Sequence, residues 1–89
     1  GAVSYDTARQ MAECILKKAA ADIGVSVTGV AGPDGSEGHM PGLVFIAAAY
    51  TGGVTVKELN ISPISREYVR EQAAEQLLKL AFNTVREVF

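Results

Sequence analysis

The sequence predicts an α/β fold in which a helix is followed by three strands and a second helix. Two segments, 4–22 and 65–86, repeat apolar residues at the spacing of a helix, and the stretch between them holds apolar or alternating runs of strand length separated by glycines. The chain has 89 residues, of which 48% are hydrophobic and 20% are charged. This is the composition of one folded domain, which we place over residues 1–89.

The first predicted helix, residues 4–22, is amphipathic with one buried stripe. Ser4 is a suitable N-cap because its hydroxyl can accept a bond from an unpaired backbone N–H, and Gly24 stands where a left-handed C-cap is expected. Cys14 lies close to the stripe and is therefore expected to be a small buried side chain. The stripe consists of Ala8, Met11, Ala12, Ile15, Leu16 and Ala19.

Three strands are predicted between the helices. Residues 25–28 alternate in polarity and form a short strand, whereas residues 42–50 are continuously apolar, which is typical of a strand buried on both faces. A glycine turn then returns the chain as a third strand over 54–61, so the last two strands form a hairpin. Lys57 and Glu58 indicate that one side of this third strand reaches solvent.

The second predicted helix follows Ser62 or Ser65, either of which can cap it, and runs to about Arg86 with Pro63 in its tolerated first turn. It carries two apolar stripes and therefore needs partners on more than one side. One stripe is expected to pack on the sheet beside the first helix, and the other predicts a homo-oligomer, most simply a twofold dimer. The first comprises Val69, Ala73, Leu77, Leu80 and Ala81; the second comprises Ala74, Leu78, Phe82, Val85 and Phe89.

Composition argues against several function classes. The net charge is −2 and the Lys and Arg residues are scattered, so no basic surface for nucleic acid is expected. The longest apolar run, 43–50, is too short to span a membrane and no signal peptide is visible, so the expected compartment is the cytoplasm. One histidine and one cysteine cannot build a His/Cys metal site or an internal disulfide, so we expect no metal and no cofactor.

The stretch from Ser26 to Gly35 carries the candidate site. It is a strand that ends in Thr28 and opens into a glycine-rich loop, 29–42, with five glycines and two prolines. Glycine can adopt positive φ and leaves backbone N–H groups open to an anion such as phosphate. The pattern alone leaves two interpretations open, an anion-binding turn and a hairpin loop in which Thr28 merely ends the strand. In either case the loop is expected to be more mobile than its flanking strands.

Charged side chains offer weaker candidates. Arg66 and Arg70 lie one turn apart on one face of the last helix, where they could clamp a phosphate or a carboxylate. An exposed face balanced by Glu67 and Glu71 is the alternative explanation. His39 lies in a polar loop and is either solvated or a substrate contact.

The run Thr28-Gly29-Val30-Ala31-Gly32-Pro33 resembles the TGxAGP signature of the CinA C-terminal domain family. Other segments resemble the family in the same order: Gly1-Ala2-Val3-Ser4 before the first helix, Gly42-Leu43-Val44-Phe45 in the long strand, and Val69-Arg70 in the last helix. The resemblance covers nearly the whole chain. It implies that the chain is the second half of a three-layer α/β family domain.

The resemblance also implies an activity, the hydrolysis of the carboxamide of nicotinamide mononucleotide to nicotinate mononucleotide and ammonia. His39-Met40-Pro41-Gly42 departs from the Lys-Pro-Val-Gly run usual in the family, which puts substrate specificity in doubt. The earlier half of the family domain, which carries the nucleophile, has no counterpart in this sequence. The implied substrate-binding residues, with Arg70 added as the anion clamp, are Thr28, Gly29, Ala31, Gly32, Pro33, Gly35 and Arg70.

Two hypotheses about function follow. In the first, the chain is part of a nicotinamide mononucleotide deamidase, contributes the TGxAGP loop to the nucleotide pocket, and is inactive alone. In the second, it is a non-catalytic truncated homologue that acts as a nucleotide-binding or oligomerisation module.

Overall fold

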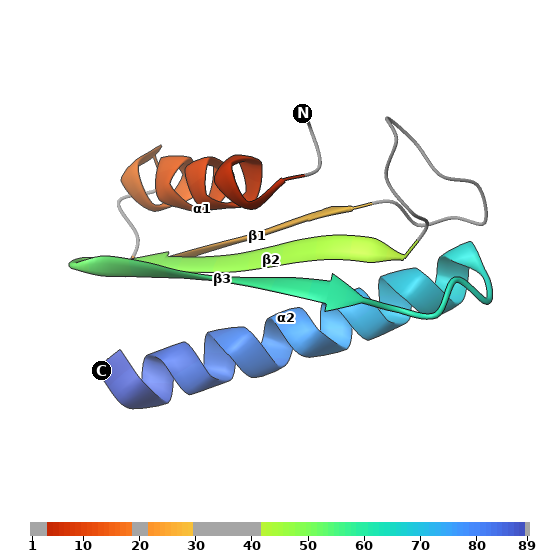
Figure 1. The fold of residues 1–89 in the computed structure, drawn as a ribbon. Helices are drawn as coiled ribbons and strands as arrows, with labels where there is room; N and C mark the ends of the chain where they lie inside the picture. Colours follow the sequence, from red (N-terminus) through yellow and green to blue (C-terminus); the bar gives the residue numbers. More distant parts are fainter. Residues whose placement is uncertain (1–3, 19–21, 30–41, 89) are drawn as a thin grey trace.

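The computed structural model of the chain describes residues 4–18, 22–29 and 42–88. Helix α1 lies above a three-stranded sheet and helix α2 lies below it, so the fold has three layers (Figure 1). The predicted α/β class and the order helix, strand, strand, strand, helix are confirmed. The elements are α1 (Tyr5–Lys18), β1 (Ile23–Gly29), β2 (Leu43–Tyr50), β3 (Gly53–Asn60) and α2 (Arg66–Val88).

The sheet is antiparallel, in the order β1-β2-β3. Strand β2 lies in the centre and is buried from Val44 to Ala49, as its continuous apolar run predicts. Its hairpin with β3 turns at Thr51 and Gly52, and Gly52 has the positive φ of 103° that this turn requires. On β3, Lys57 and Glu58 are exposed, in agreement with the sequence.

Alternation along β2 sends its side chains into two separate cores. The residues that pack under α1 are mostly alanines, which let this helix approach the sheet closely, whereas the core over α2 holds larger side chains. The first core comprises Ala8, Ala12, Phe45, Ala47 and Ala49; the second comprises Val44, Ile46, Ala48, Val69, Ala73 and Leu80.

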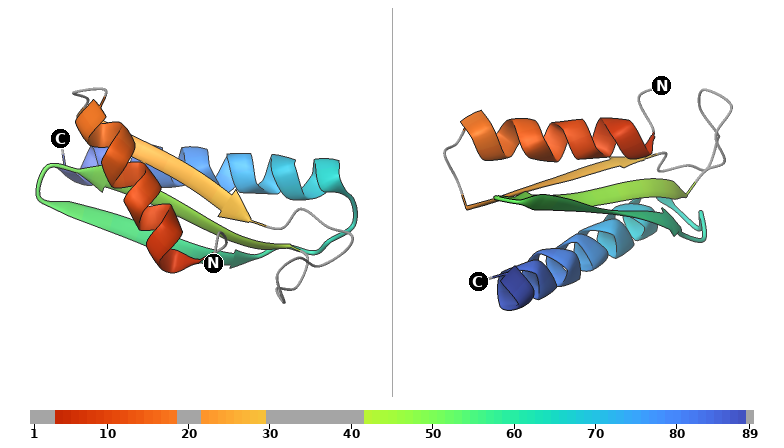
Figure 2. Two further views of the ribbon diagram at one scale, coloured as in Figure 1. Left: turned by 90° about the horizontal axis from the view of Figure 1, so that it is seen from above. Right: turned by 60° about the vertical axis from the view of Figure 1, so that its left-hand side comes forward.

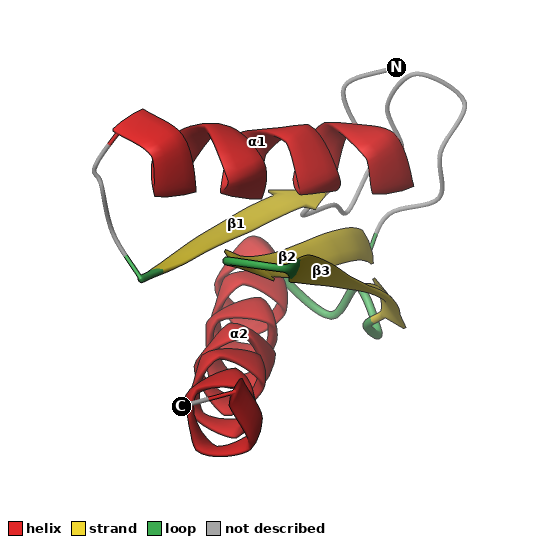
Figure 3. Ribbon diagram, turned by 90° about the vertical axis from the view of Figure 1, so that its left-hand side faces the viewer, coloured by secondary structure: helices red, strands yellow, loops and turns green. Residues whose placement is uncertain are grey.

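The expectation that α2 packs beside α1 is wrong, because the two helices cover opposite faces of the sheet (Figures 2 and 3). The reason lies in β2. A strand that is apolar on both faces leaves apolar surface in water unless each face is covered.

The prediction of Gly24 as a helix C-cap is also wrong. Gly24 is the second residue of β1 and lies directly under α1. A Cβ placed on it would come within 2.5 Å of the Ala12 carbonyl oxygen and 2.8 Å of the Leu16 backbone nitrogen. Glycine is therefore required at this position by the close approach of helix and strand, and not by its ability to cap a helix.

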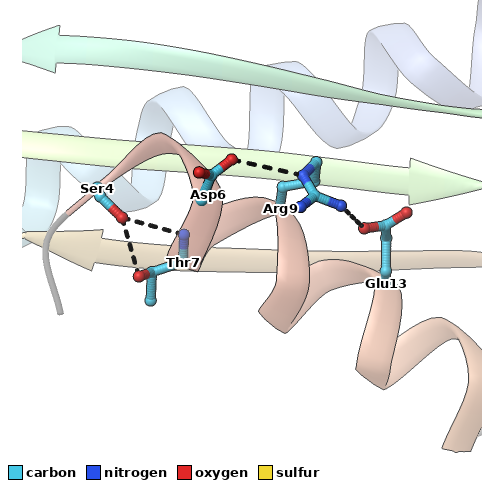
Figure 4. A network of polar contacts seen from close by, with 5 residues as sticks. All are labelled: Ser4, Asp6, Thr7, Arg9 and Glu13. Carbon is cyan, nitrogen blue, oxygen red and sulfur yellow. Dashed lines mark hydrogen bonds and ion pairs between the residues drawn. The ribbon is translucent and has the colours of Figure 1, made fainter. Parts of the chain in front are cut away.

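Caps start both helices. At α1 the Ser4 hydroxyl accepts a bond from the Thr7 N–H at 3.1 Å, as predicted, and donates to the Thr7 hydroxyl at 2.9 Å (Figure 4). At α2 the Ser65 hydroxyl accepts from the Tyr68 N–H at 3.1 Å. Of the two predicted caps Ser65 is thus the one used, and Pro63 lies before the helix instead of in its first turn.

Arg9 extends the ordered network on α1. Its guanidinium donates to the Glu13 carboxylate at 2.6 Å and lies 3.8 Å from the Asp6 carboxylate (Figure 4). These i,i+3 and i,i+4 pairs are partly exposed, so they add little to the free energy of unfolding. Their position marks this face of α1 as the solvent face.

Cys14 and the end of the first helix differ from the sequence-based predictions. Cys14 is exposed, not buried, because it falls on the solvent side of α1, beside the stripe and not within it. The first helix is described as far as Lys18; of its predicted last residues, 19–21 lie outside the described residues and Asp22 is not helical. So does the loop from 30 to 41, and its greater mobility stays a prediction.

Sequence patterns do not predict the hydrogen bond that Ser26 forms with α1. It is buried in β1, and its hydroxyl donates to the Ala8 carbonyl of α1 at 2.7 Å. A buried hydroxyl must find such a partner, since leaving it unpaired costs about 1–3 kcal/mol. The bond ties the first helix to the edge strand of the sheet.

The close approach at Gly24 predicts that Gly24→Ala lowers the free energy of unfolding by about 1–3 kcal/mol, the usual cost of overpacking, because the three nearest atoms that the new methyl meets all belong to the helix backbone. Urea denaturation followed by circular dichroism measures the change. Gly53→Ala is the matched control. Its methyl would meet only the flexible Tyr50 side chain, 3.0 Å away, and is expected to cost less. Equal losses in the two variants would contradict this account of Gly24.

The exposure of Cys14 predicts that its thiol reacts with a thiol-specific reagent in the native chain, without denaturant. The measurement is the absorbance of the released chromophore, compared with the same sample in urea. We expect the full stoichiometry of one thiol per chain in both samples. A thiol that reacts only after unfolding would mean that the side chain is covered.

Candidate functional site

A hollow of about 270 Å³ opens where β1 ends and α2 begins. The last residues of β1 form one wall, the first two turns of α2 form the other, and β2 lies at the back. The lining residues are Val27, Thr28, Gly29, Val44, Val69, Arg70 and Ala73.

The two walls are positioned by the same packing that forms the core over α2. Val44, Val69 and Ala73 are all buried members of that core, so they hold the start of α2 against the sheet. Ser65 caps α2 and so fixes where the helix begins, and this start determines the position of Arg70 along the helix. Arg70 is exposed, and it stands next to the buried Val69 at the margin of the hollow.

Gly29 has a packing role of its own. A Cβ at this position would lie 2.7 Å from the Leu43 carbonyl oxygen and 2.7 Å from a methyl carbon of Val44. The last residue of β1 therefore has to be glycine for the strand to pair closely with β2. This requirement holds with or without a ligand, so a glycine here does not by itself indicate binding.

The chemistry of the hollow is simple. Among the described residues that line it, Thr28 and Arg70 alone carry polar side chains, and the others are small or aliphatic. The Thr28 hydroxyl can donate and accept, and the Arg70 guanidinium offers several donors in a planar fork. In the described part of the chain neither Glu67 nor Glu71 forms an ion pair with Arg70. The arrangement suits a ligand with an apolar or ring portion and an anionic group.

The structure brings together three of the seven predicted site residues, Thr28, Gly29 and Arg70. The other four, Ala31, Gly32, Pro33 and Gly35, lie outside the described residues, as does His39. The apolar lining, Val27 with Val44, Val69 and Ala73, was not predicted as part of a site. Two of these residues belong to the predicted buried stripe of the second helix, but nothing in the sequence says that this stripe faces the end of the first strand.

Two other hollows lie apart from this one. The first, of about 310 Å³, is on the solvent face of α1 and is lined by Gln10, Glu13, Cys14 and Lys17. The second, of about 450 Å³, lies between the end of β3 and α2 and is lined by Leu59, Asn60, Ile61, Ser62, Tyr68, Gln72 and Gln76. Neither contains a predicted site residue.

Within residues 4–18, 22–29 and 42–88, no three His, Cys, Asp or Glu side chains gather closely enough to hold a metal ion. Over the same residues, neither helix combines the length and the hydropathy that crossing a membrane requires.

Comparison with known proteins gives consistent matches. Residues 1–85 match the family model of the CinA C-terminal domain. A protein of Streptococcus pneumoniae described as a putative competence-damage inducible protein is 48% identical over 86 residues, which is 97% of this chain and 20% of the relative. A protein of Bacillus velezensis with the same description is 47% identical over 75 residues, which is 84% of this chain and 18% of the relative.

Solved structures agree. A competence-damaged protein (CinA) superfamily protein from Klebsiella pneumoniae superposes with a TM-score of 0.89 at 29% identity, over 97% of this chain and 54% of its own. A competence/damage-inducible protein from Agrobacterium tumefaciens has a TM-score of 0.75 at 39% identity, over 91% and 53%. The chain thus spans about half the length of these solved structures and about a fifth of the curated relatives.

Proposed function

We propose that this chain, which belongs to the CinA C-terminal domain family, is part of a nicotinamide mononucleotide deamidase. In this proposal it forms one wall of the nucleotide pocket. In that reaction water cleaves the carboxamide C–N bond, the carbonyl carbon keeps the oxygen of water, and nitrogen leaves as ammonia. The observation that carries the proposal is that one hollow brings together Thr28 and Gly29, which belong to the TGxAGP run, and Arg70, which the spacing on the last helix and the resemblance of Val69-Arg70 both indicate.

The size and polarity of the hollow support binding of a part of the nucleotide. Small-molecule pockets usually measure about 300–1,000 Å³, so a hollow of about 270 Å³ accommodates one portion of a mononucleotide. The valine side chains offer apolar contact to a ring, and Arg70 offers paired N–H donors to a phosphate. The Thr28 hydroxyl can bond to a ribose or carboxamide oxygen.

The hollow contributes binding and not the chemical step. Amide hydrolysis needs a nucleophile, a group that accepts its proton, and donors for the oxyanion that develops. A guanidinium offers only hydrogen-bond donors and no acceptor, so Arg70 does not supply the base. The described residues that line the hollow include no other ionisable side chain, so the base has to come from outside this set of residues.

The second candidate, a non-catalytic nucleotide-binding or oligomerisation module, has one observation in its favour. Large apolar side chains on α2 remain exposed, with Leu78 at 71% and Phe82 at 65%, as they would in a chain whose role is to associate. The two candidates differ in whether the chain, supplied with the other half of a family domain, releases ammonia. An active complex favours the first, and an inactive complex that still binds nucleotide favours the second.

Because the described residues of the hollow supply neither a base nor an activated nucleophile, we predict that the purified chain alone releases no ammonia from nicotinamide mononucleotide above a control without protein. An enzyme-coupled ammonia assay at neutral pH makes the measurement. Release well above the control, and lost in Thr28→Ala, would contradict this prediction, because Thr28 would then be acting as more than a binding residue.

The position of Arg70 predicts that Arg70→Ala weakens the binding of nicotinamide mononucleotide by about 10- to 100-fold, since a hydrogen bond to a charged group contributes about 1.5–3 kcal/mol. Chemical-shift titration of the labelled chain gives the dissociation constant. Arg66→Ala is the matched control, because Arg66 is one turn away, equally charged, and does not line the hollow. If both variants lose the same affinity, the effect is general charge attraction and the site assignment fails.

A further inference from the structure

The hollow between the end of β3 and α2, about 450 Å³ in volume, is larger than the one at Thr28 and lies on the other side of the helix. The buried contacts of α2 with the sheet are made by β2, whereas Leu59 and Ile61 on the β3 side are only partly buried. Figure 3 shows β3 to one side of α2. The end of β3 and this side of α2 therefore form the two walls of the hollow.

The α2 wall carries a row of three polar side chains. Tyr68, Gln72 and Gln76 follow one another at intervals of four residues, so they lie on one line along the helix. All three are partly buried and line the hollow. The helix thus presents a phenol and two carboxamides, each one turn from the next, to the same space.

The hydrogen-bonding groups of this row are not used within the part of the chain that the structure describes. There the Tyr68 hydroxyl and the carboxamides of Gln72 and Gln76 form no hydrogen bond with another residue. A carboxamide offers two N–H donors and an acceptor oxygen, and a phenol both donates and accepts. The row can therefore form several hydrogen bonds with one ligand.

The β3 wall combines aliphatic surface with two further polar groups. Leu59 and Ile61 supply the aliphatic surface, and the exposed Asn60 and Ser62 supply a carboxamide and a hydroxyl. The Asn60 amide donates one bond, of 3.4 Å, to the Glu58 carboxylate, and its oxygen remains available. None of the described residues that line the hollow is charged. A charged ligand would lose water there without an opposite charge to compensate, so a neutral ligand is favoured.

We propose that this hollow binds a neutral sugar ring. A sugar ring has C–H groups on its faces and hydroxyls around its edge, so its site needs apolar surface together with donors and acceptors. Leu59, Ile61 and the Tyr68 ring provide the apolar surface. The planar carboxamides of Gln72 and Gln76 can each donate to one hydroxyl and accept from the next, as adjacent sugar hydroxyls require. The volume is that of an ordinary small-molecule pocket.

The experiment is a chemical-shift titration of the labelled chain with glucose, galactose and mannose, each to high millimolar concentration. We expect at least one of these sugars to move the backbone signals of residues 59–62 and 68–76. The dissociation constant is expected to be on the order of 1–10 mM, which is the affinity that ordinary ligand efficiency gives a molecule of this size. The signals of α1 are expected to stay in place.

Two substitutions test the carboxamides. Gln72→Leu and Gln76→Leu keep side chains of similar size, and each is expected to weaken sugar binding by about 2- to 12-fold, the effect of losing one neutral hydrogen bond. Gln10→Leu is the matched control, because Gln10 is an exposed glutamine of α1 outside this hollow, and it is expected to leave the affinity unchanged. Either leucine variant decides the question if the other disturbs folding, which circular dichroism will reveal.

Two outcomes overturn the proposal: none of the three sugars moves these signals, or the folded leucine variants bind sugar as tightly as the parent chain. N-acetylglycinamide, a neutral unit of peptide backbone, is titrated in parallel. If it moves the same signals and the sugars do not, the hollow belongs to a peptide and the proposal fails. Nicotinamide mononucleotide is expected to act at Thr28 and Arg70 in the other hollow, so the proposed function is tested separately.

Discussion

The burial of β2 on both faces is the constraint from which the rest of the fold follows. From Val44 to Ala49 each side chain is buried, alternately toward α1 and toward α2. A strand of this kind has to lie in the centre of the sheet and needs a helix on either side, because any uncovered face would expose apolar surface to water. The three-layer arrangement in Figure 1 is the solution that two helices and three strands allow.

The two faces are covered in different ways, and the difference explains where the candidate site lies. Alanines on the α1 face, and glycine at position 24, permit close contact between helix and strand, and Ser26 adds a buried bond to the helix backbone. On the other face the contacts use larger side chains, Val44, Val69 and Leu80 among them. The hollow with Thr28 and Arg70 opens at the end of this second layer, where β1 ends and α2 begins.

Helix α2 connects the core with the candidate site. Its inner side is part of the core and carries Val69 and Ala73, which hold the helix against the sheet and line the hollow. Its outer side exposes Leu78, Phe82 and Val85 to solvent. The packing that fixes the inner side therefore also fixes the position of Arg70 at the hollow.

The sequence by itself determined what depends on neighbouring residues: the class and order of the elements, the cap at Ser4, the glycine turn of the hairpin and the double burial of β2, since these follow from periodicity and local backbone preference. The TGxAGP resemblance also indicated Thr28 and Gly29. Only the tertiary structure decided which distant residues meet. It set Gly24 under α1, placed the helices on opposite faces, turned Cys14 to solvent, and brought Arg70 to Thr28. These outcomes depend on how whole surfaces pack, and a spacing pattern carries no information about the partner that an apolar surface will find.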